Sequence, residues 1–197
     1  MSPYKPDDLP VTNLDHSVLI GHVGQANAAL AEYSGMLQGI VNPNVMLSPL
    51  TRQEAVLSSK IEGTQATVEE VMQHEAGAQF DDEKKADIHE IQNYRRSLIT
   101  AQDTLADGRS LNLSLILALH GILMDSVRGK DKKPVEFRVT QNWIGSPGCA
   151  IEEATFVPPS PLQLIDHLEG WQAYMAVTDF DVLCQTCLLY TSPSPRD

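Results

Sequence analysis

The sequence predicts a mainly α-helical protein, a helical bundle with one β-hairpin. Apolar residues recur at intervals of three and four along several long segments, which is the spacing of amphipathic helices. Helix-capping residues precede several of these segments, and glycine or proline follows others. Strand character is confined to Phe137–Trp143 and Phe156–Val157, which flank the turn residues 145–148. These signals favour helices over an extensive sheet.

Composition limits the classes of function. The chain of 197 residues has a hydrophobic fraction of 42%, enough for a packed core, and a formal net charge of −12 at pH 7. This charge argues against a broad nucleic-acid-binding surface. The N-terminus lacks the pattern of a secretory signal, and no apolar run reaches the ~18 residues of a membrane span. We therefore expect a cytoplasmic protein with neither a nucleic-acid nor a membrane partner.

The chain opens with an extended arm and a long helix. Residues 1–15 carry three prolines and several charges, which favour an extended conformation. A coiled-coil seam is the weaker interpretation of the helix that follows, because its apolar stripe lasts only about three heptads. Asn42–Asn44 is expected to end this helix. The stripe, which we expect to be buried against a partner helix, consists of Leu19, Val23, Ala26, Leu30, Tyr33, Leu37 and Ile40.

A second helix is predicted over about 49–63. Ser48 is a good N-cap residue, and Pro49 fits the first helical position. Thr51 and Glu54 offer an alternative start, because their spacing fits a capping box. Gly63 is expected to end the helix in the left-handed conformation, which glycine adopts without steric cost.

Local signals also predict the remaining helices. Thr67–Glu70 has the pattern of a capping box. An apolar stripe predicts a helix over about 83–106, and a further helix opens near Asn112. Ser160–Pro161 combines an N-cap with a proline at the first position, and Asp179–Gln185 begins one more helix.

Several polar residues invite a chemical role, but a structural one is favoured for each. His74 and His89 lack the cysteine or carboxylate pattern of a metal site, so we expect ordinary surface histidines and no bound metal. Arg95–Arg96 is more typical of a solvated helix face than of a phosphate site. His120 is expected to be satisfied locally. The lysine-rich residues 128–136 are expected to form a solvated loop.

Glu62 is the one carboxylate whose position is unusual. It falls in the predicted last turn of the 49–63 helix, where the helix dipole leaves partial negative charge and disfavours another anion. This placement points to a cationic partner. A solvated surface glutamate before a glycine cap is the plainer alternative.

Two segments carry a resemblance to a known family. Ser58-x-x-x-Glu62-Gly63, within the longer run Ser58–Thr67, resembles the inhibitory-helix signature (S/T)-x-x-x-E-(G/N) of Fic-family protein adenylyltransferases. Phe137–Gly145, followed by Ala154–Pro159, is similar to the segment called the flap in that family. The two segments stand in the expected order, with helical spacing between them. The resemblance covers roughly residues 45–185.

The resemblance implies a reaction and a regulatory contact. The complete protein would transfer AMP from ATP, with Mg²⁺, to a Ser, Thr or Tyr hydroxyl of a target protein. Glu62 would pair with an arginine of the catalytic loop, Ser58 would help to fix the helix by hydrogen bonding, and Gly63 would end it. The flap would hold the target by backbone pairing. Its matching residues are Ile144, Gly145, Thr155, Phe156 and Val157.

The resemblance also implies how the chain is divided. Residues 1–106 would form an N-terminal helical region, with the inhibitory helix at about 49–63. Residues 107–186 would begin the Fic core, with the flap at about 137–158. Residues 187–197 lack a helical pattern and resemble the translation of a sequencing-library adapter. We therefore expect the native sequence to end near Thr186.

The family's catalytic loop, of the form H-x-F-x-(D/E)-G-N-G-R-x-x-R, does not occur in the 197 residues. We therefore expect no catalytic residue in this chain and no catalysis by the chain alone. Three alternatives stay open: a family member that removes AMP, one that transfers another phosphate-containing group, and a non-catalytic helical interaction or inhibitor module. A second copy of the chain, in a homodimer, is a further candidate partner.

Overall fold

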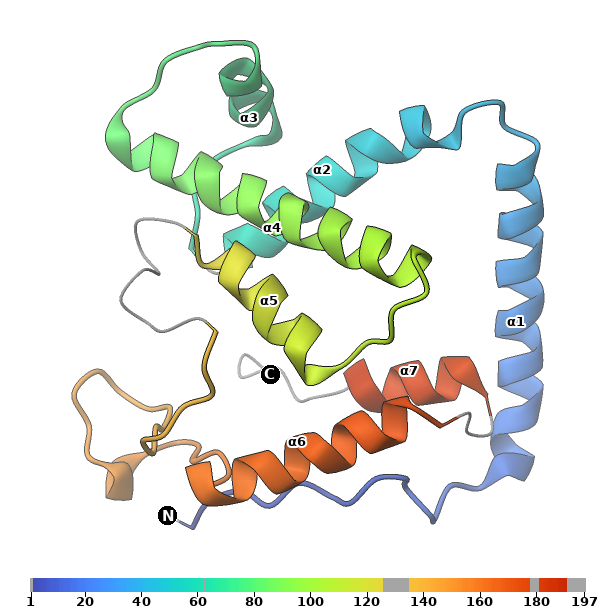
Figure 1. Cartoon of the computed structure of the whole chain (residues 1–197), viewed down its shortest axis with the longest axis vertical. Helices are drawn as coiled ribbons and strands as arrows, with labels where there is room; N and C mark the ends of the chain where they lie inside the picture. The colour runs from blue at the N-terminus through green and yellow to red at the C-terminus, as the bar shows by residue number, and fades with distance from the viewer. Residues whose placement is uncertain (1, 62, 126–134, 178–180, 191–197) are drawn as a thin grey trace. The chain divides into compact units, whose positions relative to one another are not determined.

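The computed structural model describes residues 2–61, 63–125, 135–177 and 181–190. Over these residues the protein is mainly α-helical, as the sequence predicts, and contains no β-strand (Figure 1). The described residues belong to two compact units, one formed by 1–39 with 138–197 and the other by 40–137. The helices are α1 (His16–Gln38), α2 (Pro43–Ile61), α3 (Val68–Glu75), α4 (Asp82–Ala106), α5 (Leu113–Leu123), α6 (Pro161–Met175) and α7 (Val182–Tyr190).

The unit of residues 40–137 is built around α4. This helix contacts α2, α3 and α5, and Figure 1 shows it crossing α2. The core lies between α2, α3 and α4, and its two largest buried side chains, Ile88 and Ile91, come from α4. Val68, Phe80 and Tyr94 cover its edge. The fully buried members are Ala55, Val56, Ala66, Val71, Ile88 and Ile91.

Most predicted helix starts are confirmed. Thr67 and Glu70 form the predicted capping box at α3, with both reciprocal hydrogen bonds present. The side chain of Asn112 accepts a hydrogen bond from the amide of Leu115 at 2.9 Å and caps α5. Ser160 precedes α6, with Pro161 at its first position. These starts depend on residues close together in the chain, which explains why the sequence predicts them well.

The predicted start of α2 is wrong. The helix begins at Pro43, so Pro49 lies inside it and neither Ser48 nor Thr51 is its N-cap. Proline fits the first helical position equally well at Pro43, where a missing N–H costs nothing. The hydroxyl of Thr51 donates to the carbonyl of Leu47 at 3.0 Å, a bond made from within a helix.

The long first helix is confirmed, but its expected burial is not. No residue of α1 is buried, and Leu30 and Tyr33 are 50% and 49% exposed. Its contacts within its own unit are with α7, and the side-chain amide of Asn27 donates to Asp181 at 3.0 Å. The apolar stripe therefore predicted a helix correctly without predicting what the helix packs against.

The predicted β-hairpin is reduced to one antiparallel bridge, between Ile144 and Phe156. Residues 137–143, expected to form a strand, are irregular. Pro158 and Pro159 have no N–H groups, so the chain after Phe156 cannot donate the hydrogen bonds that would lengthen the ladder.

The last helix runs further than the sequence predicts. α7 continues through Tyr190, beyond the expected loss of helical pattern at Cys187. Residues 191–197 lie outside the described residues, as do 179–180 and the lysine-rich residues 128–134. In the part of the chain that the structure describes, no helix combines the length and apolar character needed to cross a membrane.

Candidate functional site

The end of α2 is the best-defined part of the candidate site. Gly63 has φ +104°, the left-handed conformation predicted for it. Its N–H donates to the carbonyl of Lys60 at 3.1 Å, and the N–H of Thr64 donates to the carbonyl of Ser59 at 3.2 Å. This pair of bonds is the Schellman motif. A residue with a side chain would be strained at Gly63, so glycine sets where the helix ends.

The predicted inhibitory residue Glu62 lies outside the described residues, and its role stays a prediction. Its neighbours are described. The hydroxyl of Ser58 donates to Glu54, one turn earlier in α2, at 2.9 Å. Ser58 thus makes a hydrogen bond within the helix, and its role in inhibition stays a prediction.

The segment after Gly63 is anchored to α4 by Asp87. The backbone N–H of Gln65 donates to the Asp87 carboxylate at 2.6 Å, and Asp87 is only 4% exposed. Thr64 and Ala66, on either side, are buried as well. A charge-assisted hydrogen bond to a buried carboxylate is strong. This bond therefore fixes the segment that follows the C-terminal end of α2. The sequence did not predict a role for Asp87. The only indication that it is buried is its position next to Ile88, on the buried face of α4.

We expect Asp87→Ala to lower the free energy of unfolding by about 1–3 kcal/mol, because it removes the buried carboxylate that accepts the hydrogen bond from the amide of Gln65. Urea denaturation would measure the change. Asp103→Ala is the matched control, since Asp103 is an exposed aspartate on the same helix. An equal cost for the two substitutions would contradict the anchoring role of Asp87.

Glu75 of α3 links its own helix to α2 and α4. Its two carboxylate oxygens lie 3.2 Å from Arg52 of α2 and 3.2 Å from Arg95 of α4. Arg96 pairs with Asp125 at 2.9 Å. The two neighbouring arginines, expected on a solvated face, therefore each have a carboxylate partner.

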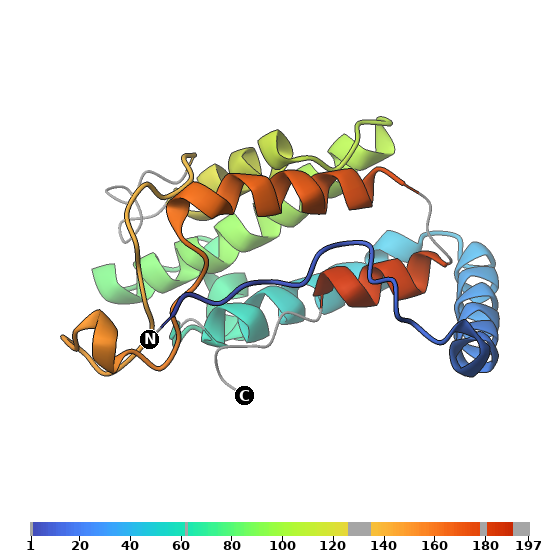
Figure 2. The ribbon, with the colours of Figure 1, turned by 90° about the horizontal axis from the view of Figure 1, so that it is seen from below.

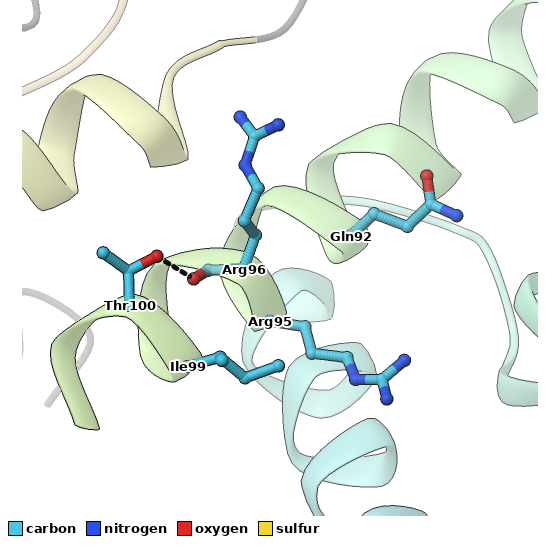
Figure 3. Close-up of a pocket in the computed structure, with 5 residues that line it drawn as sticks. All are labelled: Gln92, Arg95, Arg96, Ile99 and Thr100. Carbon is cyan, nitrogen blue, oxygen red and sulfur yellow. Dashed lines mark hydrogen bonds between the residues drawn. The ribbon is translucent and has the colours of Figure 1, made fainter. Parts of the chain in front are cut away.

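A shallow hollow on α4 contains both arginines (Figure 3). Figure 3 shows that the side chains of Arg95 and Arg96 point in different directions, and the hydroxyl of Thr100 donates to the carbonyl of Arg96 at 2.8 Å. Because each guanidinium already faces a carboxylate, this hollow is poorly suited to hold a phosphate group. Its lining residues are Gln92, Arg95, Arg96, Ile99 and Thr100.

His74 and His89 lie in a small cluster of rings with Phe80. His74 and His89 lie edge to face with ring centroids 5.9 Å apart, and Phe80 lies 6.3 Å from His74. Within the described ranges, no three His, Cys, Asp or Glu side chains are grouped so that they could hold a metal ion.

The capping box at α3 makes part of the stability depend on pH. The amide of Thr67 donates to Glu70 at 2.7 Å, and this bond, followed by the Lys84 ammonium at 3.1 Å, lowers the pKa of Glu70. A carboxyl whose pKa falls on folding stabilises the protein above its unfolded value of 4.5, and the effect is lost as the pH falls through the folded value.

We therefore expect Glu70→Gln to reduce the loss of stability on acidification below pH about 4.5. Urea midpoints measured across this range would show a shallower slope than in the unsubstituted protein. Glu69→Gln is the control, because it removes a carboxylate from the same turn and leaves the bonds of Glu70 to Thr67 and Lys84 in place. Identical slopes for Glu70→Gln and the unsubstituted protein would contradict this role.

The residues predicted to form the flap lie close together around one bridge. The N–H of Ile144 donates to the carbonyl of Phe156 at 2.8 Å, and the carbonyl of Ile144 accepts from Thr155 and Phe156 at 2.8 and 3.1 Å. Val157 is buried, whereas Ile144 and Phe156 are 45% and 38% exposed. The bridge therefore presents two apolar side chains on its surface.

Gly145 has no room for a side chain. A Cβ atom there would lie 2.6 Å from the sulfur of Cys149 and 3.3 Å from the Cα of Ala154. The turn can close against the returning chain only because Gly145 lacks a side chain. The indole N–H of Trp143 also donates to the carbonyl of Cys149, at 3.0 Å.

Side chains hold the returning part of the flap where strand pairing does not. The guanidinium of Arg138 donates to the carbonyl of Pro159, and the side-chain amide of Gln141 donates to the carbonyl of Pro158 at 3.1 Å. These two side chains thus donate to carbonyls that receive no hydrogen bond from strand pairing.

Comparison with known proteins supports the resemblance in the N-terminal part of the chain. Residues 20–103 match the family model described as Fic/DOC family N-terminal. The match includes α2, α3 and most of α1 and α4, and it ends before the flap. It supports membership of the Fic family. No curated protein matched the chain in this comparison.

Proposed function

We propose that this chain carries the inhibitory helix and the target-binding flap of a Fic-family protein adenylyltransferase, which transfers AMP from ATP to a Ser, Thr or Tyr hydroxyl of a target protein. One observation carries the proposal. A helix within the region that matches the Fic/DOC N-terminal model ends at Gly63 in a Schellman motif, directly after Ser58-x-x-x-Glu62.

The proposed regulation is a competition for one arginine. A carboxylate and a phosphate both accept two parallel hydrogen bonds from a guanidinium. Glu62 would hold the arginine of the catalytic loop, so that the γ-phosphate of ATP loses its partner and AMP transfer slows. Asp87 and the Schellman motif would keep the end of α2 in the position that this contact needs.

We propose that ATP and Mg²⁺ bind outside the residues that the structure describes. The two neighbouring arginines of α4 face carboxylates, and no group of three suitable metal ligands occurs in the described ranges. The nucleotide and its metal ion would bind to the family's catalytic loop, whose pattern the 197 residues do not contain. The support for the regulatory part of the proposal is the helix end at Gly63, and the described residues supply no step of the chemistry.

A second candidate is a non-catalytic helical interaction or inhibitor module. The observation that favours it is the core between α2, α3 and α4, whose members all come from residues 55–94. Such a unit can present a helix end to a partner without any catalytic loop. Removal of AMP, or transfer of another phosphate-containing group, is a variant of the first candidate.

An ATP-labelling experiment distinguishes the two candidate functions. The complete gene product is incubated with Mg²⁺ and with ATP labelled at either the α- or the γ-phosphate, and protein-bound label is measured. We expect the α-label to be retained and the γ-label to be released. Retention of the γ-label would indicate phosphoryl transfer. No label from either nucleotide would favour the interaction module.

A further inference from the structure

The N-terminal arm lies against the flap. Residues 2–15 contain no helix, and Figure 2 shows them running extended to the start of α1. The N–H of Tyr4 donates to the carbonyl of Val157 at 2.7 Å. The Tyr4 ring packs against Phe156, with ring centroids 5.7 Å apart and a tilt of 44°. The arm and the flap belong to the same compact unit.

This contact uses the free edge of the bridge. Phe156 directs both its N–H and its carbonyl to Ile144. In an extended chain the backbone groups of successive residues point to opposite sides, so the carbonyl of Val157 faces away from Ile144. The N–H of Tyr4 donates to this outward-facing carbonyl. Addition of an extended segment to an open edge is the mode by which peptides join a β-structure.

We propose that the N-terminal arm is a built-in occupant of the target-binding edge of the flap, and that a target segment binds there only after the arm has left. This inference rests on the proposed function, which assigns target binding to the flap. It also defines the segment that this edge accepts. Such a segment is extended, donates a backbone N–H to Val157, and places an aromatic side chain on Phe156.

The contact is suited to displacement. Tyr4 remains 47% exposed, and none of residues 2–8 is buried. One backbone hydrogen bond and one ring pair are expected to favour the docked arm by only about tenfold. A segment with a better fit can therefore replace the arm, and loss of the arm removes no core residue.

Peptide titration tests the proposal without ATP. A synthetic peptide with the sequence of residues 2–8 is added at millimolar concentrations to the complete gene product, and NMR shifts of the flap amides of Ile144, Thr155 and Val157 are followed. A variant that lacks residues 2–8 should show saturable shifts. The unsubstituted protein should need about tenfold more peptide, because its own arm competes.

The substitution Tyr4→Ala should make the flap accessible in the same way as the deletion. Tyr33→Ala is the matched control, since Tyr33 is also about half exposed in the same unit but lies on α1. A peptide with alanine in place of its tyrosine should not bind. The proposal is overturned if the unsubstituted and arm-deleted proteins titrate identically, or if the peptide leaves the flap amides unshifted. Normal titration without any AMP transfer would instead refute only the proposed function.

Discussion

Replacing Glu62 with glycine is expected to raise the initial rate of AMP transfer by the complete protein by about 5–150-fold. This range corresponds to the coupling of about 1–3 kcal/mol that links two sites in a typical regulated protein. The substitution removes the carboxylate that is proposed to hold the catalytic-loop arginine, which then becomes available to the γ-phosphate of ATP. The measurement is the rate at which α-labelled AMP becomes bound to protein.

Two further variants distinguish the effect of removing the Glu62 charge from the effect of placing a glycine in the last turn of α2. Lys60→Gly places a glycine in the same last turn of α2 and leaves Glu62 unchanged, so its rate should stay close to that of the unsubstituted protein. Glu62→Gln removes the charge and keeps the size, and its rate should rise. Equal rates for Glu62→Gly and the unsubstituted protein would contradict the inhibitory role of Glu62.

Replacing Ile88 with alanine is expected to lower the free energy of unfolding by about 2–5 kcal/mol. Ile88 is fully buried where α4 meets α2 and α3, so the truncation leaves a cavity in the only core cluster described for the unit of residues 40–137. Urea denaturation followed by circular dichroism would measure the loss. The same core holds α2, so the variant should also weaken the bond between Gln65 and Asp87.

Ile99→Ala is the control for this substitution. Ile99 lies on the same helix and is 42% exposed, so its truncation should cost far less. Ile88→Val, which removes a single methylene group, should cost about 0.5–1.5 kcal/mol. A cost for Ile88→Ala no larger than that for Ile99→Ala would contradict the core assigned to this unit.

The sequence predicted best those features that depend on neighbouring residues. The capping box of Thr67 and Glu70, the cap at Asn112 and the left-handed turn at Gly63 each arise within a few residues, and the structure confirms all three. The start of α2 was misplaced because two prolines, Pro43 and Pro49, fit the same rule, and only their order along the helix distinguishes them.

Features that join distant parts of the chain could not be predicted in the same way. The bond between Gln65 and Asp87 spans 22 residues, and the only local indication that this aspartate is buried is its position next to Ile88. The contact of Tyr4 with Val157 joins the N-terminal arm to a segment far along the chain. The predicted hairpin was longer than the observed bridge. Alternating apolar and polar residues predict strand character, whereas the missing N–H groups of Pro158 and Pro159 limit the ladder.

The sequence of the gene beyond the codon for Thr186 tests the central claim most directly. We predict that the reading frame of the native gene continues into a loop of the form H-x-F-x-(D/E)-G-N-G-R-x-x-R, whose second arginine gives Glu62 its partner. A native gene that encodes residues 187–197 as they stand here and then stops would contradict the account. The helical interaction module would then be the better explanation of this chain.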